Sequence, residues 1–193
     1  MTREPTIAAI VLAAGLSRRA GRRNKLLDDV GGQPMISAVV ATVFASRARP
    51  VVVVTGHEAV LVHHVLVGQP VEFVRNADYR SGMAGSIGCG IGALPASASG
   101  TLICLGDMPE VAVTTLDRLI ETALVTTYTD ILVPVEDGRR GNPVLFGFRW
   151  FDQLSGLDGD RGARQLLDDN PDRVAEVIVG DSGILVDYDG GVE

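Results

Sequence analysis

The sequence is poor in the residues that mark secreted, metal-stapled or membrane-spanning proteins. Its 193 residues include two cysteines, Cys89 and Cys104, which lie far apart and have no nearby histidine. We therefore expect neither a structural disulfide nor a zinc site, and we expect both cysteines to be small buried residues. No apolar run approaches the ~20 residues that a bilayer-spanning helix requires. Because the N-terminus also lacks a cleavable signal pattern, we expect a cytoplasmic protein.

Positive charge is also scarce. The formal net charge is −7 at pH 7, so we expect no general affinity for nucleic acid or for an anionic membrane, because both require a positive surface. Intrinsic disorder is excluded, since 46% of the residues are hydrophobic and 21% are charged. A chain of this length can bury a core without a disulfide or a metal, and we expect residues 1–193 to form a single domain.

What the sequence does contain is a regular alternation of short β-branched runs and helical stretches. The predicted strands are residues 6–12, 50–55, 71–75, 101–105 and 130–135. The predicted helices between them are residues 34–46, 58–66, 84–94 and 113–126. Nearly continuous apolar strands separated by helices are typical of a parallel sheet that is covered on both faces. The pattern therefore predicts an α/β fold, a three-layer α/β/α sandwich with a mostly parallel, doubly wound sheet.

The regular alternation of strands and helices ends in the last third of the chain. Residues 136–147 are polar and contain glycine, and short helices are predicted over residues 148–154 and 161–169. Late strands are predicted over residues 173–179 and 184–187. No linker or repeat separates this part, so we expect it to extend the same sheet.

The loop after the first predicted strand concentrates positive charge in an acidic chain. It holds five of the 17 basic residues, namely Arg18, Arg19, Arg22, Arg23 and Lys25. The small residues before them leave backbone N–H groups open to an anionic ligand. Lys25 is the only lysine in the sequence, and its compact ammonium can follow phosphate charge where a planar guanidinium cannot. The loop predicts polyphosphate binding; the alternative is a solvated surface lysine.

A second candidate follows the fourth predicted strand, where Asp107 stands between Gly106 and Met108-Pro109. A carboxylate at the carboxyl end of a strand suits Mg²⁺, which typically uses one or two carboxylates plus substrate phosphates. The alternative is an aspartate that merely forms a turn. Asp187 and Asp189 would share a face of the last predicted strand and could add a metal ligand, or they could belong to a solvated turn.

Other motifs are missing or ambiguous. Neither a Walker A loop nor a G-x-S-x-G elbow is present, and the loose glycine pattern at Gly88, Gly90 and Ala93 indicates a helix that packs closely on the sheet rather than a dinucleotide site. The residues of the polar segments 76–86, 139–144 and 159–164, taken alone, favour a structural role over a functional one.

Taken together, the motifs over residues 7–165 resemble those of MobA-like nucleotidyltransferases, in particular the molybdenum cofactor cytidylyltransferase branch. The matching residues are 12–19 with 24–27, 106–109, 82–86, 140–144 and 159–163. The resemblance implies a Rossmann-like nucleotidyltransferase fold. It also implies Mg²⁺-dependent transfer of a nucleotide monophosphate from an NTP to a phosphorylated acceptor, with release of pyrophosphate.

The resemblance also assigns roles to residues. It implies that Lys25, Arg19 and Asp107 are catalytic, that Asp107 and Asp189 hold the metal, and that Arg140 and Asn142 contact the acceptor. The nucleotide-binding residues that it implies are Leu12, Ala13, Ala14, Gly15, Ser17, Arg18, Lys25, Gly82 and Ser86.

The same resemblance favours particular substrates. The Ala-Ala-Gly form of the first loop resembles enzymes that use CTP, whereas the guanylyltransferase branch usually reads Ala-Gly-Gly there. The implied acceptor is molybdopterin, and a molybdoenzyme or cofactor-insertion protein is the implied partner. Two departures from the family pattern are Ala20, where methionine is usual, and the partly kept ending at residues 187–191. The alternatives are a GTP-dependent guanylyltransferase, transfer to another phosphorylated molecule such as a sugar phosphate, and a non-catalytic chaperone of the cofactor.

Overall fold

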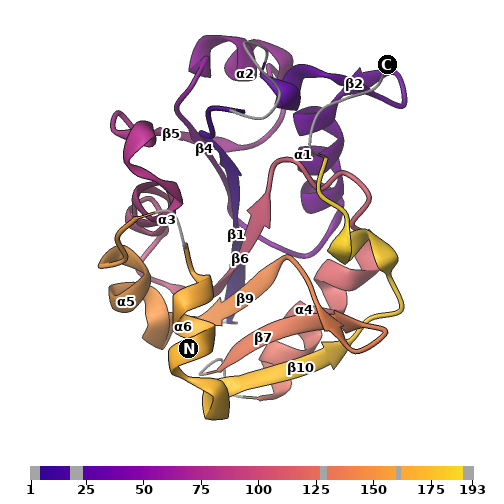
Figure 1. Ribbon diagram of the computed structural model, residues 1–193, viewed down its shortest axis with the longest axis vertical. Coiled ribbons are helices and arrows are strands. Elements are labelled where there is room, and N and C mark those ends of the chain that lie inside the picture. The colour runs from indigo at the N-terminus through magenta and orange to yellow at the C-terminus, as the bar shows by residue number, and fades with distance from the viewer. Residues whose placement is uncertain (1–4, 18–23, 127–129, 160–161, 189–193) are drawn as a thin grey trace.

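A central sheet organises the structure, a computed structural model that describes residues 5–17, 24–126, 130–159 and 162–188 (Figure 1). The strands follow the order β10-β7-β9-β6-β1-β4-β5, and β8 pairs with β7. Their bounds are β1 Thr6–Ala13, β4 Val51–Thr55, β5 Glu72–Arg75, β6 Ala98–Leu105, β7 Ile131–Glu136, β8 Arg139–Arg140, β9 Val144–Gly147 and β10 Val174–Ile178. Strand β1 therefore lies in the interior of the sheet, between β6 and β4.

The sheet is mostly parallel, as the sequence predicts. Strands β6, β1, β4 and β5 pair in parallel, and so do β7 and β10. The exceptions in the described sheet are β9, which runs antiparallel to both β6 and β7, and the short β8. The sequence analysis missed β9, because its four residues directly follow a polar segment and are too short to show a period of their own.

Helices cover both faces of the sheet. Side chains along β1 alternate, so that Ala9 and Val11 pack into one core while Ile10 packs into the other. The first core joins helices α1, α2 and α4, and the second joins α3, α5 and α6, which Figure 1 shows on opposite sides of the sheet. The helices are α1 Met35–Ala45, α2 Ala59–Val65, α3 Met83–Gly92, α4 Val113–Val125, α5 Phe151–Ser155 and α6 Arg164–Asp169. The predicted three-layer sandwich is confirmed.

Short elements complete the fold. Strands β2 Asp29–Val30 and β3 Gln33–Pro34 form a separate antiparallel pair. The 3₁₀ helices are η2 Lys25–Leu27, η3 Tyr79–Ser81, η4 Phe148–Trp150, η5 Pro171–Arg173 and η6 Ser182–Leu185. Over the described ranges, no helix has both the length and the apolar character that crossing a bilayer demands.

The last predicted strand is wrong, because residues 182–185 form the 3₁₀ helix η6. The cause is Asp181, whose Oδ1 accepts the backbone N–H of Gly183 at 3.0 Å. Its other carboxylate oxygen accepts from Ala112 N at 2.9 Å and from Thr115 Oγ1 at 2.6 Å. These bonds fix the tail against the start of α4 and turn it away from the sheet. The strand face that Asp187 and Asp189 were expected to share is therefore absent; Asp187 is exposed, and Asp189 lies outside the described residues.

Helix α3 packs closely on the sheet because of its small residues. A Cβ atom at Gly90 would lie 2.6 Å from Ile10 Cγ2 on β1, closer than real side chains approach. Gly92, two residues later, has nothing within 4 Å of its Cβ position. This agrees with the packing interpretation of the glycine pattern.

This contrast predicts different effects of two alanine substitutions in one helix. Both Gly90→Ala and Gly92→Ala gain about the same helix propensity, so their difference reports the clash with Ile10. We expect Gly90→Ala to be less stable than Gly92→Ala by about 1–3 kcal/mol, measured as the free energy of unfolding in urea. Equal stabilities of the two variants would contradict the close packing of α3 on β1.

Candidate functional site

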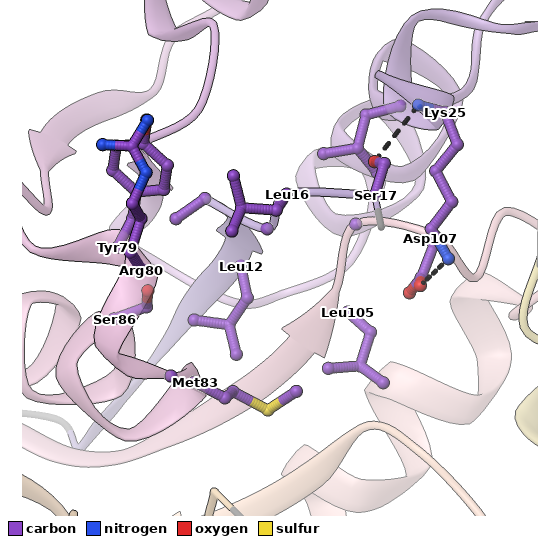
Figure 2. Close-up of a pocket in the computed structure, with 15 residues that line it drawn as sticks. Leu12, Leu16, Ser17, Lys25, Tyr79, Arg80, Met83, Ser86, Leu105 and Asp107 are labelled. Carbon is purple, nitrogen blue, oxygen red and sulfur yellow. Dashed lines mark hydrogen bonds and ion pairs between the residues drawn. The ribbon is translucent and has the colours of Figure 1, made fainter. Parts of the chain in front are cut away.

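The loops that follow β1, β5 and β6 surround a cavity of about 360 Å³ (Figure 2). It lies at the carboxyl ends of neighbouring parallel strands, where ligands bind in sheets of this type. Residues from all three loops line it, including Gly15 and Lys25 after β1, Arg80 and Ser86 after β5, and Asp107 after β6.

Local structure fixes the position of Lys25. Asn24 caps the 3₁₀ helix η2, and its Oδ1 accepts the backbone N–H of Leu26 at 3.2 Å. The backbone N–H of Lys25 donates to Ser17 Oγ at 3.3 Å, which ties the helix to the end of the first loop. Leu26 is buried in the core next to it. The backbone of Lys25 is therefore anchored on both sides, and its side chain extends into the cavity.

Asp107 is held beside β1 by the glycine that precedes it. The N–H of Gly106 donates to Leu12 O at 3.1 Å, and a Cβ atom at Gly106 would lie 2.7 Å from that same oxygen. Only glycine allows the turn after β6 to approach the end of β1 this closely. The close approach carries the Asp107 carboxylate toward the loop that holds Lys25.

The two predicted catalytic side chains meet. Lys25 Nζ lies 2.7 Å from Asp107 Oδ2, and the two side chains are 15% and 23% exposed. The same ammonium donates to the carbonyl of Tyr188 at 2.7 Å, while the N–H of Tyr188 donates to Asp107 O at 2.9 Å. The ion pair thus joins the segment after β1 to the turn after β6, and Tyr188 of the C-terminal segment forms a hydrogen bond with each of the two residues.

The opposite wall of the cavity carries no carboxylate among the residues described there. Figure 2 shows Tyr79, Arg80 and Ser86 across the cavity from Lys25 and Asp107. Gly56 makes room for this wall, because a Cβ atom there would lie 2.5 Å from Tyr79 Cβ and 2.9 Å from Ala14 Cβ. The guanidinium of Arg80 lies over the Tyr79 ring, 5.0 Å from its centroid. The cavity therefore has an ion pair at one end, and at the other end it has the Arg80 guanidinium and the Ser86 hydroxyl without a carboxylate among the residues described there.

A second cavity of about 390 Å³ adjoins the first, and Met83 and Leu105 line both. Its apolar wall comes from β6, β7, β9 and α3, and its polar groups are Arg140, Asn142, Arg164 and Asp168. Arg140 Nε is held by Glu176 Oε1 on β10 at 2.8 Å. The two cavities therefore meet at the wall that Met83 and Leu105 form.

The structure thus gathers most of the residues that the sequence analysis singled out. Those lining the first cavity are Leu12, Ala14, Gly15, Ser17, Lys25, Gly82, Ser86 and Asp107. The predicted acceptor residues Arg140 and Asn142 line the second cavity. The side chain of Ala13 is buried in the core instead, so only its backbone can serve a ligand. Arg18, Arg19 and Asp189 lie outside the described residues.

The sequence analysis missed several lining residues. Tyr79, Arg80 and Met83 stand within the polar segment 76–86, which the sequence singled out without indicating which of its side chains face a ligand. Arg164 and Asp168 lie one helical turn apart on α6 and both line the second cavity. Their spacing of four residues could have predicted that they share one face of a helix.

The carboxylates of the first cavity limit the kind of metal site that it can form. Among the described residues, no group of three or more histidine, cysteine, aspartate or glutamate side chains could hold a metal ion. Asp107 is the carboxylate among the described residues that line the first cavity. One carboxylate in an open cavity fits Mg²⁺, which takes its remaining ligands from substrate phosphates and water. The set does not fit a metal held by protein ligands alone.

Comparison with known proteins places the chain among nucleotidyltransferases. The MobA-like NTP transferase domain family matches residues 9–174. The purine catabolism protein PucB of Bacillus subtilis is 30% identical, and the match covers 97% of this chain and 93% of PucB. Nicotine blue oxidoreductase of Paenarthrobacter nicotinovorans is also 30% identical, with 86% of this chain and 84% of that protein covered. The match to the bifunctional protein GlmU of Kineococcus radiotolerans is 36% identical but spans a quarter of GlmU.

Solved structures agree. Rv0371c of Mycobacterium tuberculosis superposes with a TM-score of 0.88 at 27% identity, over 98% of this chain and 95% of that chain. A complex of Rv0371c with manganese has a TM-score of 0.78 at 25% identity, over 90% and 88% of the two chains. A nucleotidyl transferase from Methanothermobacter has a TM-score of 0.83 at 26% identity, over 96% and 92%.

Neither cysteine belongs to the site. Cys104 lies in the buried strand β6, and burial raises the pKa of its thiol from 9.0 to about 12. Because the thiolate is the reactive form, we expect Cys104 to stay unreactive toward a disulfide reagent at pH 8 in the folded protein. The check is a Cys89→Ala variant, in which Cys104 is the remaining thiol: it should react on addition of guanidinium chloride and not before. Rapid reaction in the native variant would contradict the burial of this strand.

Proposed function

Because the chain belongs to the MobA-like NTP transferase family and is a nucleotidyltransferase, we propose that it transfers CMP from CTP to molybdopterin and releases pyrophosphate. The observation that carries the proposal is the pair of adjoining cavities, with Lys25 and Asp107 converging at one end of the first. One cavity takes the NTP and the other takes the acceptor, so that the reacting groups meet at the wall they share.

The charged end of the first cavity suits the triphosphate. In the structure, Asp107 and the Tyr188 carbonyl are the acceptors for the ammonium of Lys25. A triphosphate offers the same ammonium stronger anionic acceptors, so Lys25 would exchange these partners for phosphate oxygens. Ala14 and Gly15 of the first loop line this cavity, and their backbone N–H groups would bind the nucleotide.

Asp107 would hold a divalent cation, for which we propose Mg²⁺. A bound magnesium ion supplies charge neutralisation on the triphosphate and on the departing pyrophosphate. The role of Asp107 is to place that charge on the side of the cavity where Lys25 lies. Together the two side chains would restrain the triphosphate, so that its α-phosphorus faces the second cavity.

The reaction itself requires little covalent chemistry from the protein. A phosphate oxygen of the acceptor attacks the α-phosphorus of CTP, and the bond from that phosphorus to the pyrophosphate oxygen breaks. Rate then depends on holding the two substrates in line. In the second cavity, Arg140 and Arg164 would attract the acceptor's phosphate, and the Asn142 amide would hydrogen-bond its polar ring atoms.

The choice of CTP and molybdopterin rests on the similarity of residues 12–19, 82–86 and 140–144 to the cytidylyltransferase branch. GTP as donor, a sugar phosphate as acceptor, and a non-catalytic cofactor chaperone are the alternatives. We propose that residues 1–193 act as one nucleotidyltransferase domain in the cytoplasm, with a molybdoenzyme or cofactor-insertion protein as recipient of the product.

A substrate panel tests this proposal. We expect pyrophosphate release, measured by a coupled phosphate assay, with CTP and molybdopterin together and with neither alone. Each of the four NTPs is paired with molybdopterin and with sugar phosphates under identical magnesium concentrations. Preference for GTP or for a sugar phosphate would replace the proposed substrates, and binding of molybdopterin without pyrophosphate release from any NTP would favour the chaperone.

Single substitutions test the charged end of the cavity. We expect Asp107→Asn to lower kcat by about 100-fold or more, because the cation loses its carboxylate. Lys25→Met should lower kcat to a similar extent, and Lys25→Arg should recover part of it, because a guanidinium restores the charge but not the shape. Asp172→Asn, at an exposed aspartate that lines neither cavity, is the matched control. Activity of Asp107→Asn within a few-fold of the wild type would overturn its role.

A further inference from the structure

A buried amide lies directly behind the wall of the first cavity that carries Ser86. Asn76 follows the last residue of β5 and is 4% exposed. Its backbone N–H donates to Thr55 O at 2.8 Å, which fixes it to the end of β4. Asn76 does not line the cavity, so any effect it has on a ligand passes through a neighbour.

The orientation of the Asn76 amide is determined by its surroundings. Its Oδ1 accepts the backbone N–H of Asp78 at 2.9 Å. A backbone N–H can only donate, so a flipped amide would place two donors against each other. The Nδ2 group therefore faces Ser86, and it donates to Ser86 Oγ at 3.0 Å.

This bond sets the direction of the Ser86 hydroxyl. A serine hydroxyl has one proton to donate and two lone pairs that accept. Because one lone pair of Oγ receives the Asn76 proton, the hydroxyl's own proton must point elsewhere. Within the described part of the chain, no acceptor for that proton is found, although Ser86 is 5% exposed and lines the cavity. The hydroxyl is thus left with a proton to donate to a ligand.

We infer that Asn76 is a positioning residue that makes Ser86 a hydrogen-bond donor to the O2 carbonyl of a pyrimidine base; the inference rests on the proposed function. In Figure 2, Ser86 stands across the cavity from Lys25 and Asp107, so a nucleotide whose phosphates reach Lys25 has its base on the Ser86 side. Pyrimidines present an acceptor, O2, at the edge where guanine presents the donor N2 amino group. A fixed hydroxyl donor therefore favours CTP over GTP.

Reversing the polarity of residue 76 tests this inference. A carboxylate in Asn76→Asp can only accept, so it would draw the Ser86 proton to itself and away from the base. The measurement is the affinity for Mg–CTP and Mg–GTP without acceptor, by titration calorimetry. We expect Asn76→Asp to weaken CTP binding about ten-fold and to leave GTP binding within about two-fold of the wild type. A general electrostatic or structural effect would weaken the binding of CTP and of GTP equally, and that result would overturn the inference.

A double-mutant cycle shows whether Asn76 acts through Ser86. Ser86→Ala alone should also weaken CTP binding about ten-fold, and Asn76→Asp combined with Ser86→Ala should weaken it no further. Additive losses would overturn the inference. Ser81→Ala is the matched control, because Ser81 lies at the end of η3, is exposed, does not line the cavity, and donates to Asp78 O at 2.7 Å.

A modified nucleotide keeps the test independent of folding. If Asn76→Asp does not fold, Asn76→Ala takes its place in the cycle. In parallel, 2-thio-CTP replaces the O2 acceptor with sulfur. The wild type should bind 2-thio-CTP about ten-fold more weakly than CTP. The Ser86→Ala variant should bind the two nucleotides with equal affinity, because it has no hydroxyl to donate to either. Equal binding of both nucleotides to the wild type would overturn the inference. A wild-type protein that binds no NTP would overturn the proposed function instead.

Discussion

The ion pair between Lys25 and Asp107 depends on two strands that are distant along the chain and adjacent in the sheet. Strands β1 and β6 pair in parallel, and Leu12 and Leu105 are register partners at their carboxyl ends. The residues that follow these partners therefore emerge side by side. Glycine at position 106 allows the turn after β6 to approach the end of β1, because any Cβ there would clash with Leu12 O. The site exists because a strand register and one missing side chain place a cation 2.7 Å from a carboxylate.

The C-terminal segment connects this pair to the second cavity. Asp181 fastens the segment to the start of α4, Ile184 O accepts the backbone N–H of Asn142 at 3.0 Å, and Tyr188 O accepts from Lys25 Nζ. A short stretch thus touches the proposed acceptor residue at one end and the proposed phosphate-binding residue at the other. Because neither contact belongs to the sheet, the tail holds the relative position of the two cavities independently of the strand register.

The two ends of the first cavity would contact different parts of the nucleotide. In the proposed function, the end with Lys25 and Asp107 would contact phosphates, which every NTP carries, so it would provide rate without selecting the base. Ser86, oriented by the Asn76 amide behind it, would face the base, where pyrimidines and guanine differ. The relatives of this chain carry different names: purine catabolism protein PucB, nicotine blue oxidoreductase and, over part of the chain, the bifunctional protein GlmU. One fold can host different functions, so the fold alone does not set the acceptor. The second cavity, with Arg164 and Asp168 on α6, is where acceptor choice would be made.

The sequence by itself determined the layered α/β fold, and it singled out Lys25 and Asp107 as candidate site residues. Apolar strands buried on both faces carry their own pattern, and a lone lysine in a basic loop is visible without coordinates. Only the tertiary structure decided that residues 182–185 form a helix, that β9 enters the sheet, and that Asn76 aims its amide at Ser86. These features arise from hydrogen bonds between separate segments, such as Asp181 with Thr115, and no local pattern of residues encodes a partner that far away.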